Sequence, residues 1–258
     1  MLRFVINLDR SVDRLSFMTQ QLDELGVSFS RISAVDGKML SSEERRSLEP
    51  SVFSLSRAAF PRSLSAAEVG CFLSHRKCWE AIANSDEDWG LIMEDDIILS
   101  PSATPFLKDP SWIPDGVDIV QLYIVDDTWT AKVSPQKYIV QGTNYHLSHP
   151  LKPTPVGSLA YVISHKATLL AMSLSKKLIA PVDEFLFSPH LQFARTFPVW
   201  RLNPAIAKHA ETASTIGDSR RLEAYTSLLW KIHPYRFYLR MRLSLMRKKA
   251  LPEQFTFK

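Results

Sequence analysis

The sequence has few glycines and no long hydrophobic run. Only 8 of its 258 residues are glycine, and it contains no G-x-x-x-x-G-K-[ST], G-x-G-x-x-G or G-x-S-x-G pattern. This argues against a glycine-rich loop that cradles phosphates. The apolar run at the amino terminus is short and soon followed by charges, which is typical of neither a signal peptide nor a membrane span. We therefore expect a cytoplasmic protein.

Cysteine is also scarce. Cys71 and Cys78 lie in a stretch that is predicted to be helical, where two turns separate them by about 10 Å. That distance is too long for a disulfide, and the pair lacks the C-x-x-C spacing of zinc sites. We expect two buried thiols on one helix face, in a reducing compartment.

The excess of positive charge belongs to the carboxyl-terminal segment. The chain has 31 Lys+Arg and 27 Asp+Glu, a net charge of +4. Removing the seven bases between Glu223 and Glu253 leaves 24 bases against 27 acids, a net charge of −3. Those seven are Lys231, Arg236, Arg240, Arg242, Arg247, Lys248 and Lys249. The body of the chain is therefore mildly acidic and the tail is basic.

The basic tail is also rich in apolar and aromatic residues. Phe237, Met241 and Leu245 recur at every fourth position, which predicts a helix with an apolar edge beside its bases. Such a helix favours reversible contact with an anionic membrane surface. Nucleic-acid binding and an ordinary solvated helix are the alternatives that the same charges allow.

Strands and helices alternate along the rest of the chain. The patterns predict strands at 4–8, 27–37, 91–96, 117–125 and 156–164, and helices at 11–26, 65–85 and 165–174. This order predicts one α/β domain, residues 1–219, with a mostly parallel central sheet, followed by a helical tail, residues 220–258. Residues 126–155 are rich in Pro, Asn, Ser and Thr, and we expect them to form a loop near a site.

Two residues of the predicted helix at 65–85 have simple structural explanations. Ser65 and Glu68 form an S-x-x-E capping box. His75 falls on the apolar stripe between Phe72 and Trp79, where a histidine is more often a core residue than a ligand.

Three carboxylates follow an apolar strand in "LIMEDDIIL". Glu94 and Asp96 are two residues apart, so on a strand their side chains point to the same side. Ligands of α/β proteins bind at the carboxyl ends of parallel strands, and carboxylate oxygens there suit Mg²⁺ or Mn²⁺. The alternative is an acidic turn that faces solvent, but the apolar flanks on both sides argue against it.

Two further places carry candidate functional groups. "PVDEFLF" embeds Asp183 and Glu184 beside apolar residues, although Pro181 and Asp183 also suit the first turn of an ordinary helix. His209 is a candidate late metal ligand, and a plain surface histidine is the alternative.

Six segments together resemble glycosyltransferase family 25. They are "FVINLDRSVDR", "FSRISAVDG", "LSAAEVGCFLSHRKCWEAI", "LIMEDDIIL", "GSLAYVISHKA" and "PVDEFLF". Their order and spacing match over roughly the first 215 residues. The stretch from GCFLSH to EDD is the specific part of the match, because EDD alone is a common sequence.

The resemblance implies a GT-A fold and inverting transfer from a nucleotide sugar, with Mn²⁺ or Mg²⁺ held by a DxD-like motif. The motif here begins with Glu94 instead of Asp, and Asp96 and His209 complete the implied ligand set. Inverting transfer needs a general base, and we select Asp183 because its apolar neighbours in PVDEF favour a raised pKa, with Glu184 as its substitute. The residues expected near the donor are Asn7, Asp9, Arg14, Asp36, Ser74, His75 and Asp95.

The implied substrate is a UDP-hexose, with galactose favoured over glucose by family habit. The implied acceptor is a lipid-linked lipopolysaccharide or lipooligosaccharide core at the cytoplasmic face of a bacterial inner membrane. A metal-dependent nucleotidyltransferase would need similar residues but would release pyrophosphate. A non-enzymatic membrane- or nucleic-acid-binding protein would leave the EDD motif unexplained. We expect no nucleic-acid partner.

Overall fold

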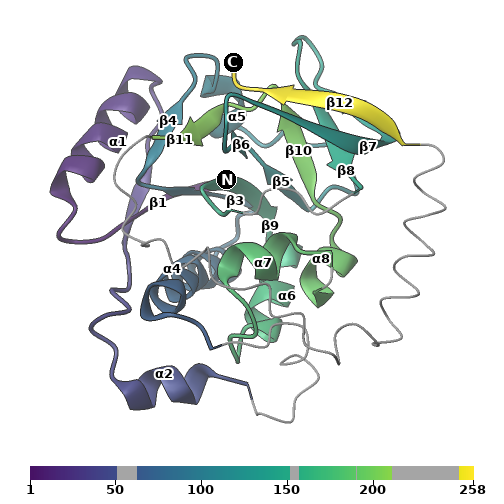
Figure 1. Cartoon of the computed structure of the whole chain (residues 1–258). Helices are drawn as coiled ribbons and strands as arrows, with labels where there is room; N and C mark the ends of the chain where they lie inside the picture. The colour runs from purple at the N-terminus through teal and green to yellow at the C-terminus, as the bar shows by residue number, and fades with distance from the viewer. Residues whose placement is uncertain (51–62, 152–156, 190, 211–249) are drawn as a thin grey trace, which may run out of the picture.

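A nine-stranded sheet forms the centre of the fold (Figure 1). The structure is a computed structural model, and it describes residues 1–50, 63–151, 157–189, 191–210 and 250–258. From one edge to the other the strands are β12 (Leu251–Thr256), β7 (Thr128–Ile139), β8 (His146–Pro150), β10 (Trp200–Asn203), β5 (Ile119–Gln121), β9 (Ala160–Ser164), β3 (Trp89–Glu94), β1 (Leu2–Asn7) and β2 (Ser30–Ser33).

The main sheet is mixed, so the prediction of a mostly parallel sheet is wrong. Only β1–β2, β1–β3 and β5–β10 pair in parallel, and the other five pairs are antiparallel. One reason is that β9 enters between β3 and β5 in the opposite direction. The other is that β8, β7 and β12 form an antiparallel edge beside β10. Even so, β1, β2, β3, β5 and β10 all run the same way. Their carboxyl ends therefore meet at one edge, where ligands of α/β proteins bind.

A three-stranded sheet continues the main sheet beyond this edge. Its strands, in order, are β4 (Ile97–Leu99), β11 (Ala207–His209) and β6 (Tyr123–Ile124). The chain passes from the large sheet to the small one after β3, after β5 and after β10. The predicted strand at 117–125 is accordingly split at Leu122, and Asp95 and Asp96 occupy the crossing between β3 and β4.

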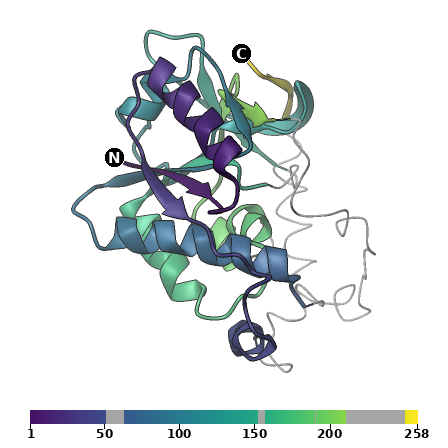
Figure 2. The same cartoon turned by 90° about the vertical axis from the view of Figure 1, so that its left-hand side faces the viewer.

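Helices cover both faces of the main sheet (Figures 1 and 2). The helices are α1 (Val12–Glu24), α2 (Ser42–Leu48), α4 (Ala66–Ala83), α5 (Thr104–Lys108), α6 (His165–Leu174), α7 (Val182–Phe187) and α8 (Gln192–Thr196). Alternate side chains of each strand enter opposite cores: Val5 packs with Met18 of α1, whereas Phe4 packs with the helices α4, α6, α7 and α8. No helix in the described part of the chain is long and apolar enough to cross a membrane.

The local predictions hold best at α4. The Ser65 hydroxyl accepts a hydrogen bond from the Glu68 amide at 3.2 Å, and the Glu68 carboxylate accepts one from the Ser65 amide at 2.8 Å, which confirms the capping box. Both cysteines on α4 are free thiols, but only Cys78 is fully buried, since Cys71 is partly exposed.

The predicted end of α1 is also confirmed. Gly26 follows this helix with a φ of 62°, as expected of a glycine at a helix end.

Two predictions of irregular or helical structure are wrong. Residues 126–155 were expected to form a loop, but the described part contains the antiparallel pair β7 and β8. Residues 251–256 were expected to be helical, but they form β12, which pairs with β7 from Leu251↔Val133 to Thr256↔Thr128. Residues 211–249, which hold most of the predicted tail, lie outside the described residues.

Glu253 attaches β12 to the rest of the sheet. Its carboxylate accepts hydrogen bonds from Ser148 at 2.9 Å and Asn203 at 2.7 Å, and it pairs with Lys137 and His146 at 2.6 Å. Burial alone raises the pKa of Glu253, but the hydrogen bonds outweigh burial and lower it to about 2. The folded protein therefore stabilises the ionised carboxylate.

We expect Glu253→Gln to destabilise the protein by up to about 3 kcal/mol at pH 7, the equivalent of a pKa lowered from 4.5 to about 2. Because the folded pKa is the lower one, this stabilisation is complete above pH 4.5 and is lost as the pH falls towards 2. Urea unfolding at several pH values measures it, with the exposed Glu80→Gln on α4 as control. Equal unfolding of wild type and Glu253→Gln at pH 7 would refute the role of Glu253.

Candidate active site

The EDD motif lies where the carboxyl ends of β1 and β3 meet. The parallel register sets Ile6 beside Glu94, so Asn7 reaches the following residue, Asp95. The Glu94 amide donates to the carbonyl of Leu159 at 2.8 Å, and the Ala210 amide donates to the carbonyl of Asp96 at 2.8 Å. The main chain on both sides of the motif is therefore held by segments that are distant in sequence.

The three carboxylates of the motif have different partners. Glu94 accepts a hydrogen bond from the Ser158 hydroxyl at 2.6 Å. Asp95 accepts one from the Asn7 amide nitrogen at 2.7 Å. The Arg14 guanidinium lies 3.2 Å from Asp95 and 3.4 Å from Asp96. Because β3 ends at Glu94, Asp95 and Asp96 lie in a bend, where the alternation expected of a strand no longer fixes their side chains.

Asp96 is in an environment that disfavours its charge. Burial raises the pKa of Asp96 to about 7, and the negative charges of Glu94 and Asp95 add to the increase while Arg14 opposes it. Its Oδ1 is buried and has no hydrogen-bond partner within the described residues. A buried carboxylate oxygen without a partner is costly, and a cation would supply the missing interaction.

His209 is brought to the same place by β11. Its Nε2 lies 3.7 Å from Oδ2 of Asp96, and its backbone pairs with Ile97 of β4. Oxygen ligands from Glu94 and Asp96, with an imidazole beside them, fit a divalent ion such as Mn²⁺ or Mg²⁺. The structure thus brings His209 beside Asp96, whereas Glu94 groups with Cys71 and His75 and not with these two residues in the described part of the chain. A shared ligand set of Glu94, Asp96 and His209 stays a prediction.

Asn7 connects the ends of three elements. Its amide group donates to Asp95 and to the carbonyl of Ser11 at 2.9 Å, and its Oδ1 accepts from Arg31 at 3.0 Å. The exposed Asp9 pairs with Arg31 and accepts from Ser33. The hydrogen bond from Arg31, followed by that from Ser33, lowers the pKa of Asp9, so Asp9 is ionised beside the end of β2.

The turn at Asp36 packs closely against α4. A Cβ atom at position 37 would lie 1.6 Å from the carbonyl oxygen of Ala66, and a Cβ atom at position 70 would lie 2.5 Å from that of Val35. Only glycine therefore fits at Gly37 and Gly70. Asp36 itself accepts from the Lys38 amide, the main cause of its lowered pKa, and pairs with Arg10.

Ser74 and His75 are both buried on α4. The Ser74 hydroxyl donates to the Gly70 carbonyl at 2.7 Å and accepts from the Val35 amide at 2.8 Å, so it joins the helix to the Asp36 turn. A contact between Ser74 and a donor stays a prediction. Nδ1 of His75 lies 2.9 Å from the Tyr161 hydroxyl, and its Nε2 lies 3.4 Å from Glu94. His75 is therefore both a core residue and a neighbour of the EDD motif.

Asp183 and Glu184 lie in the first turn of α7, which packs on α4 through Phe185 and Phe72, with ring centroids 5.1 Å apart. Burial, followed by the charge of Asp183, raises the pKa of Glu184. The negative charges of Glu94 and Asp183 both raise the pKa of Cys71, after the larger effect of burial. The folding of α7 thus brings Asp183 to the region of the EDD motif.

Several polar residues near the motif were not identified from the sequence. Ser158 donates to Glu94, and Gln121 donates to the Gly157 carbonyl at 3.2 Å. The Tyr123 hydroxyl lies 2.5 Å from where a Cβ of residue 157 would sit, so Gly157 leaves room for it. Gln121 and Tyr123 interrupt the apolar run "IVQLYIV" with polar groups, and this interruption could have identified them as candidates from the sequence.

A protein-family model matches most of the chain. The model for "Glycosyltransferase family 25 (LPS biosynthesis protein)" matches residues 1–186. A "Glycosyltransferase 25 family member" of Aedes aegypti is 31% identical over 197 residues, covering 71% of this chain and 30% of the relative. The "Lipooligosaccharide biosynthesis protein lex-1" of Haemophilus influenzae is 30% identical over 151 residues, covering 56% and 50%.

A human relative aligns over most of the chain. The "Procollagen galactosyltransferase 2" of Homo sapiens is 28% identical over 239 residues, covering 90% of this chain and 34% of the relative. The chain thus spans half or less of the length of these three relatives.

Proposed function

The chain belongs to glycosyltransferase family 25. On this premise we propose that it transfers a hexose from a UDP-sugar to a lipopolysaccharide or lipooligosaccharide core, with galactose favoured over glucose as the hexose. In this proposal the fold is of the GT-A type and transfer inverts the configuration of the sugar carbon. The main support for the proposal is the buried, unpartnered Oδ1 of Asp96 just after β3, with His209 beside it. The printed names of the relatives support galactose and the bacterial acceptor.

The residues of the motif would hold Mn²⁺ or Mg²⁺ against the donor diphosphate. When bound, the ion supplies positive charge that stabilises the departing UDP. Asn7 at the end of β1 and Arg14 in α1 orient Asp95 and Asp96, so the carboxylates keep their places without the ion. This preorganisation lowers the cost of binding the donor.

Asp183 takes the proton of the acceptor hydroxyl in this proposal. Inversion needs the acceptor oxygen to attack the sugar carbon on the side opposite the departing UDP, so the base must lie on the acceptor side. Asp183 comes from α7 and not from the strand ends that carry the EDD motif, which supports this division of roles. Membership of a glycosyltransferase family favours glycosyl transfer over nucleotidyl transfer as the reaction.

A panel of nucleotide sugars tests the donor class. We expect UDP-galactose to raise the melting temperature of the protein more than GDP-, CMP- or dTDP-sugars do, and only when Mn²⁺ or Mg²⁺ is present. Release of UDP with a core oligosaccharide as acceptor then identifies transfer. Stabilisation by a nucleoside triphosphate, with release of pyrophosphate, would favour the nucleotidyltransferase alternative.

Membrane contact through the basic tail is a further part of the proposal, and its seven bases lie outside the described residues. Near an anionic leaflet each base contributes about 1 kcal/mol, which would place the protein at the cytoplasmic face of the inner membrane. Because the tail includes β12, which belongs to the main sheet, deletion is a poor test. We expect full-length protein to float with anionic vesicles, and substitution of all seven bases by glutamine to abolish flotation. Unchanged flotation of the substituted protein would refute the contact.

A further inference from the structure

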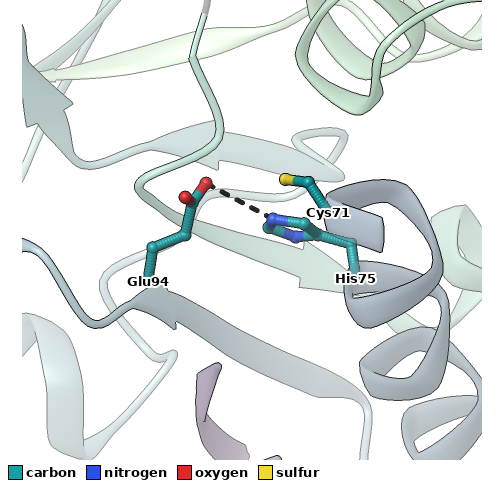
Figure 3. Close-up of side chains that lie close together, drawn as sticks. All are labelled: Cys71, His75 and Glu94. Atoms are coloured by element: carbon teal, nitrogen blue, oxygen red, sulfur yellow. Dashed lines mark ion pairs between the residues drawn. The ribbon is translucent and has the colours of Figure 1, made fainter. Parts of the chain in front are cut away.

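A second group of potential metal ligands lies beside the donor site. Cys71 and His75 are one turn apart on α4, and Glu94 comes from the end of β3 (Figure 3). One ligand atom from each of the three residues lies within 4.8 Å of the others. Figure 3 shows the Glu94 carboxylate directed towards the His75 ring, with the Cys71 sulfur above it.

His75 is the member that points to a ligand. It is fully buried, and its Nε2 has no hydrogen-bond partner within the described residues although it lies 3.4 Å from Glu94. Its ring is held from the other side, where Nδ1 lies 2.9 Å from the Tyr161 hydroxyl, which in turn accepts from Trp79 at 2.9 Å. Such a support behind a histidine fixes the direction of its free nitrogen, as in known metal sites.

The three residues supply one sulfur, one nitrogen and one oxygen. A thiolate with an imidazole and a carboxylate selects zinc-like ions, whereas Mg²⁺ and Mn²⁺ prefer sets of oxygen ligands. We propose that Cys71, His75 and Glu94 bind a zinc-like divalent cation, and that this ion inhibits transfer by withdrawing Glu94 from the donor site. The inhibition rests on the proposed function, but the binding does not.

The spacing of the ligands suits such an ion. With metal bonds of about 2.0 to 2.3 Å, neighbouring ligand atoms of a tetrahedral zinc site are about 3.5 Å apart. The separation of His75 and Glu94 is already 3.4 Å. A water molecule would complete the four ligands.

Binding changes the protonation of two side chains. The Cys71 thiol gives its proton to the buffer and binds as thiolate. The His75 ring binds in its neutral form through Nε2, so its proton is on Nδ1 and is donated to the Tyr161 oxygen. Each ion bound therefore releases one proton, and no oxidant or reductant is required.

Cobalt titration of the full chain tests the site without any substrate. Thiolate-bound Co²⁺ absorbs in the near ultraviolet, and we expect this absorption from wild type and from Cys78→Ala, which removes the other cysteine of α4. We expect its loss in Cys71→Ala and in Cys71→Ser, with Zn²⁺ displacing Co²⁺ from wild type. Equal absorption by wild type and a folded Cys71→Ala, or none by wild type, would overturn the site.

Inhibition is measured separately with Mn²⁺ and donor present. We expect Zn²⁺ to inhibit wild type and Cys78→Ala equally, and the concentration for half inhibition to rise at least tenfold in Cys71→Ala. Cobalt binding together with equal inhibition of all variants would refute the effect on Glu94 and leave the site standing. Absence of transfer in every variant would refute the proposed function, while the cobalt spectra would still decide the site.

Discussion

Asp96→Ala is expected to abolish transfer and to leave the fold intact. The substitution removes a carboxylate that would hold the donor ion, and stabilising the charge on a leaving group contributes roughly 10²–10³-fold or more to the rate. Stability should not fall, because the fold disfavours the Asp96 charge: burial and then Glu94 raise its pKa to about 7. Without metal, the variant should therefore melt at the wild-type temperature or above it.

The control for Asp96 is an exposed aspartate near it in sequence. Asp86 lies in the turn before β3 and is solvent-exposed, so Asp86→Ala should keep both transfer and melting temperature. Transfer rates at saturating donor and thermal melting are measured on both variants. Full turnover by Asp96→Ala would remove Asp96 from the ligand set, and a large loss of stability would show that it has a structural role.

The second large effect is expected of Asp183→Asn. An asparagine can still accept the hydrogen bond that Oδ1 receives from the Glu184 amide at 2.9 Å, but it cannot take a proton. We expect kcat to fall by roughly 10²–10⁴-fold, the usual contribution of a general base, with little change in the binding of UDP and metal. Steady-state rates and UDP affinity measure the two effects separately.

Glu184→Gln is the matched control, because Glu184 is the neighbouring carboxylate on the same turn of α7. Burial, followed by the charge of Asp183, raises the pKa of Glu184, which disfavours its ionised form. A loss below tenfold in Asp183→Asn, with a large loss in Glu184→Gln, would transfer the role to Glu184. Equal loss of UDP binding in Asp183→Asn would make Asp183 a binding residue.

Local sequence patterns predict part of the first half of the fold. The Ser65–Glu68 capping box depends on residues that are close in sequence and forms as expected. The strand predicted at 91–96 also forms, but it spans Trp89–Glu94, and the short elements α2, β4 and α5 were not predicted. The pairing of distant strands could not be predicted in the same way. An apolar run such as that at 117–125 is compatible with one strand or with two, and only the position of β9 and β11 decides that it divides between two sheets.

The candidate site was predicted to a similar extent. The EDD motif was visible because carboxylates between apolar segments are unusual, and the structure brings Asn7, Arg14 and His209 to it. Ser158 was missed because a serine before a strand is common and its contact with Glu94 arises only on folding. For His75 the structure confirms the position in the core and sets the ring beside Glu94, while a role as a ligand stays a prediction.

Calorimetric titration with UDP-galactose measures whether a metal ion links the donor to the carboxylates after β3. We expect wild-type protein to bind this donor tightly with Mn²⁺ or Mg²⁺ and at least tenfold more weakly after chelation, and Asp96→Ala to bind it weakly under both conditions. Asp86→Ala should behave as wild type. Equal affinity of wild type and Asp96→Ala with Mn²⁺ present would contradict the claim that the carboxylates after β3 hold the donor through a metal ion.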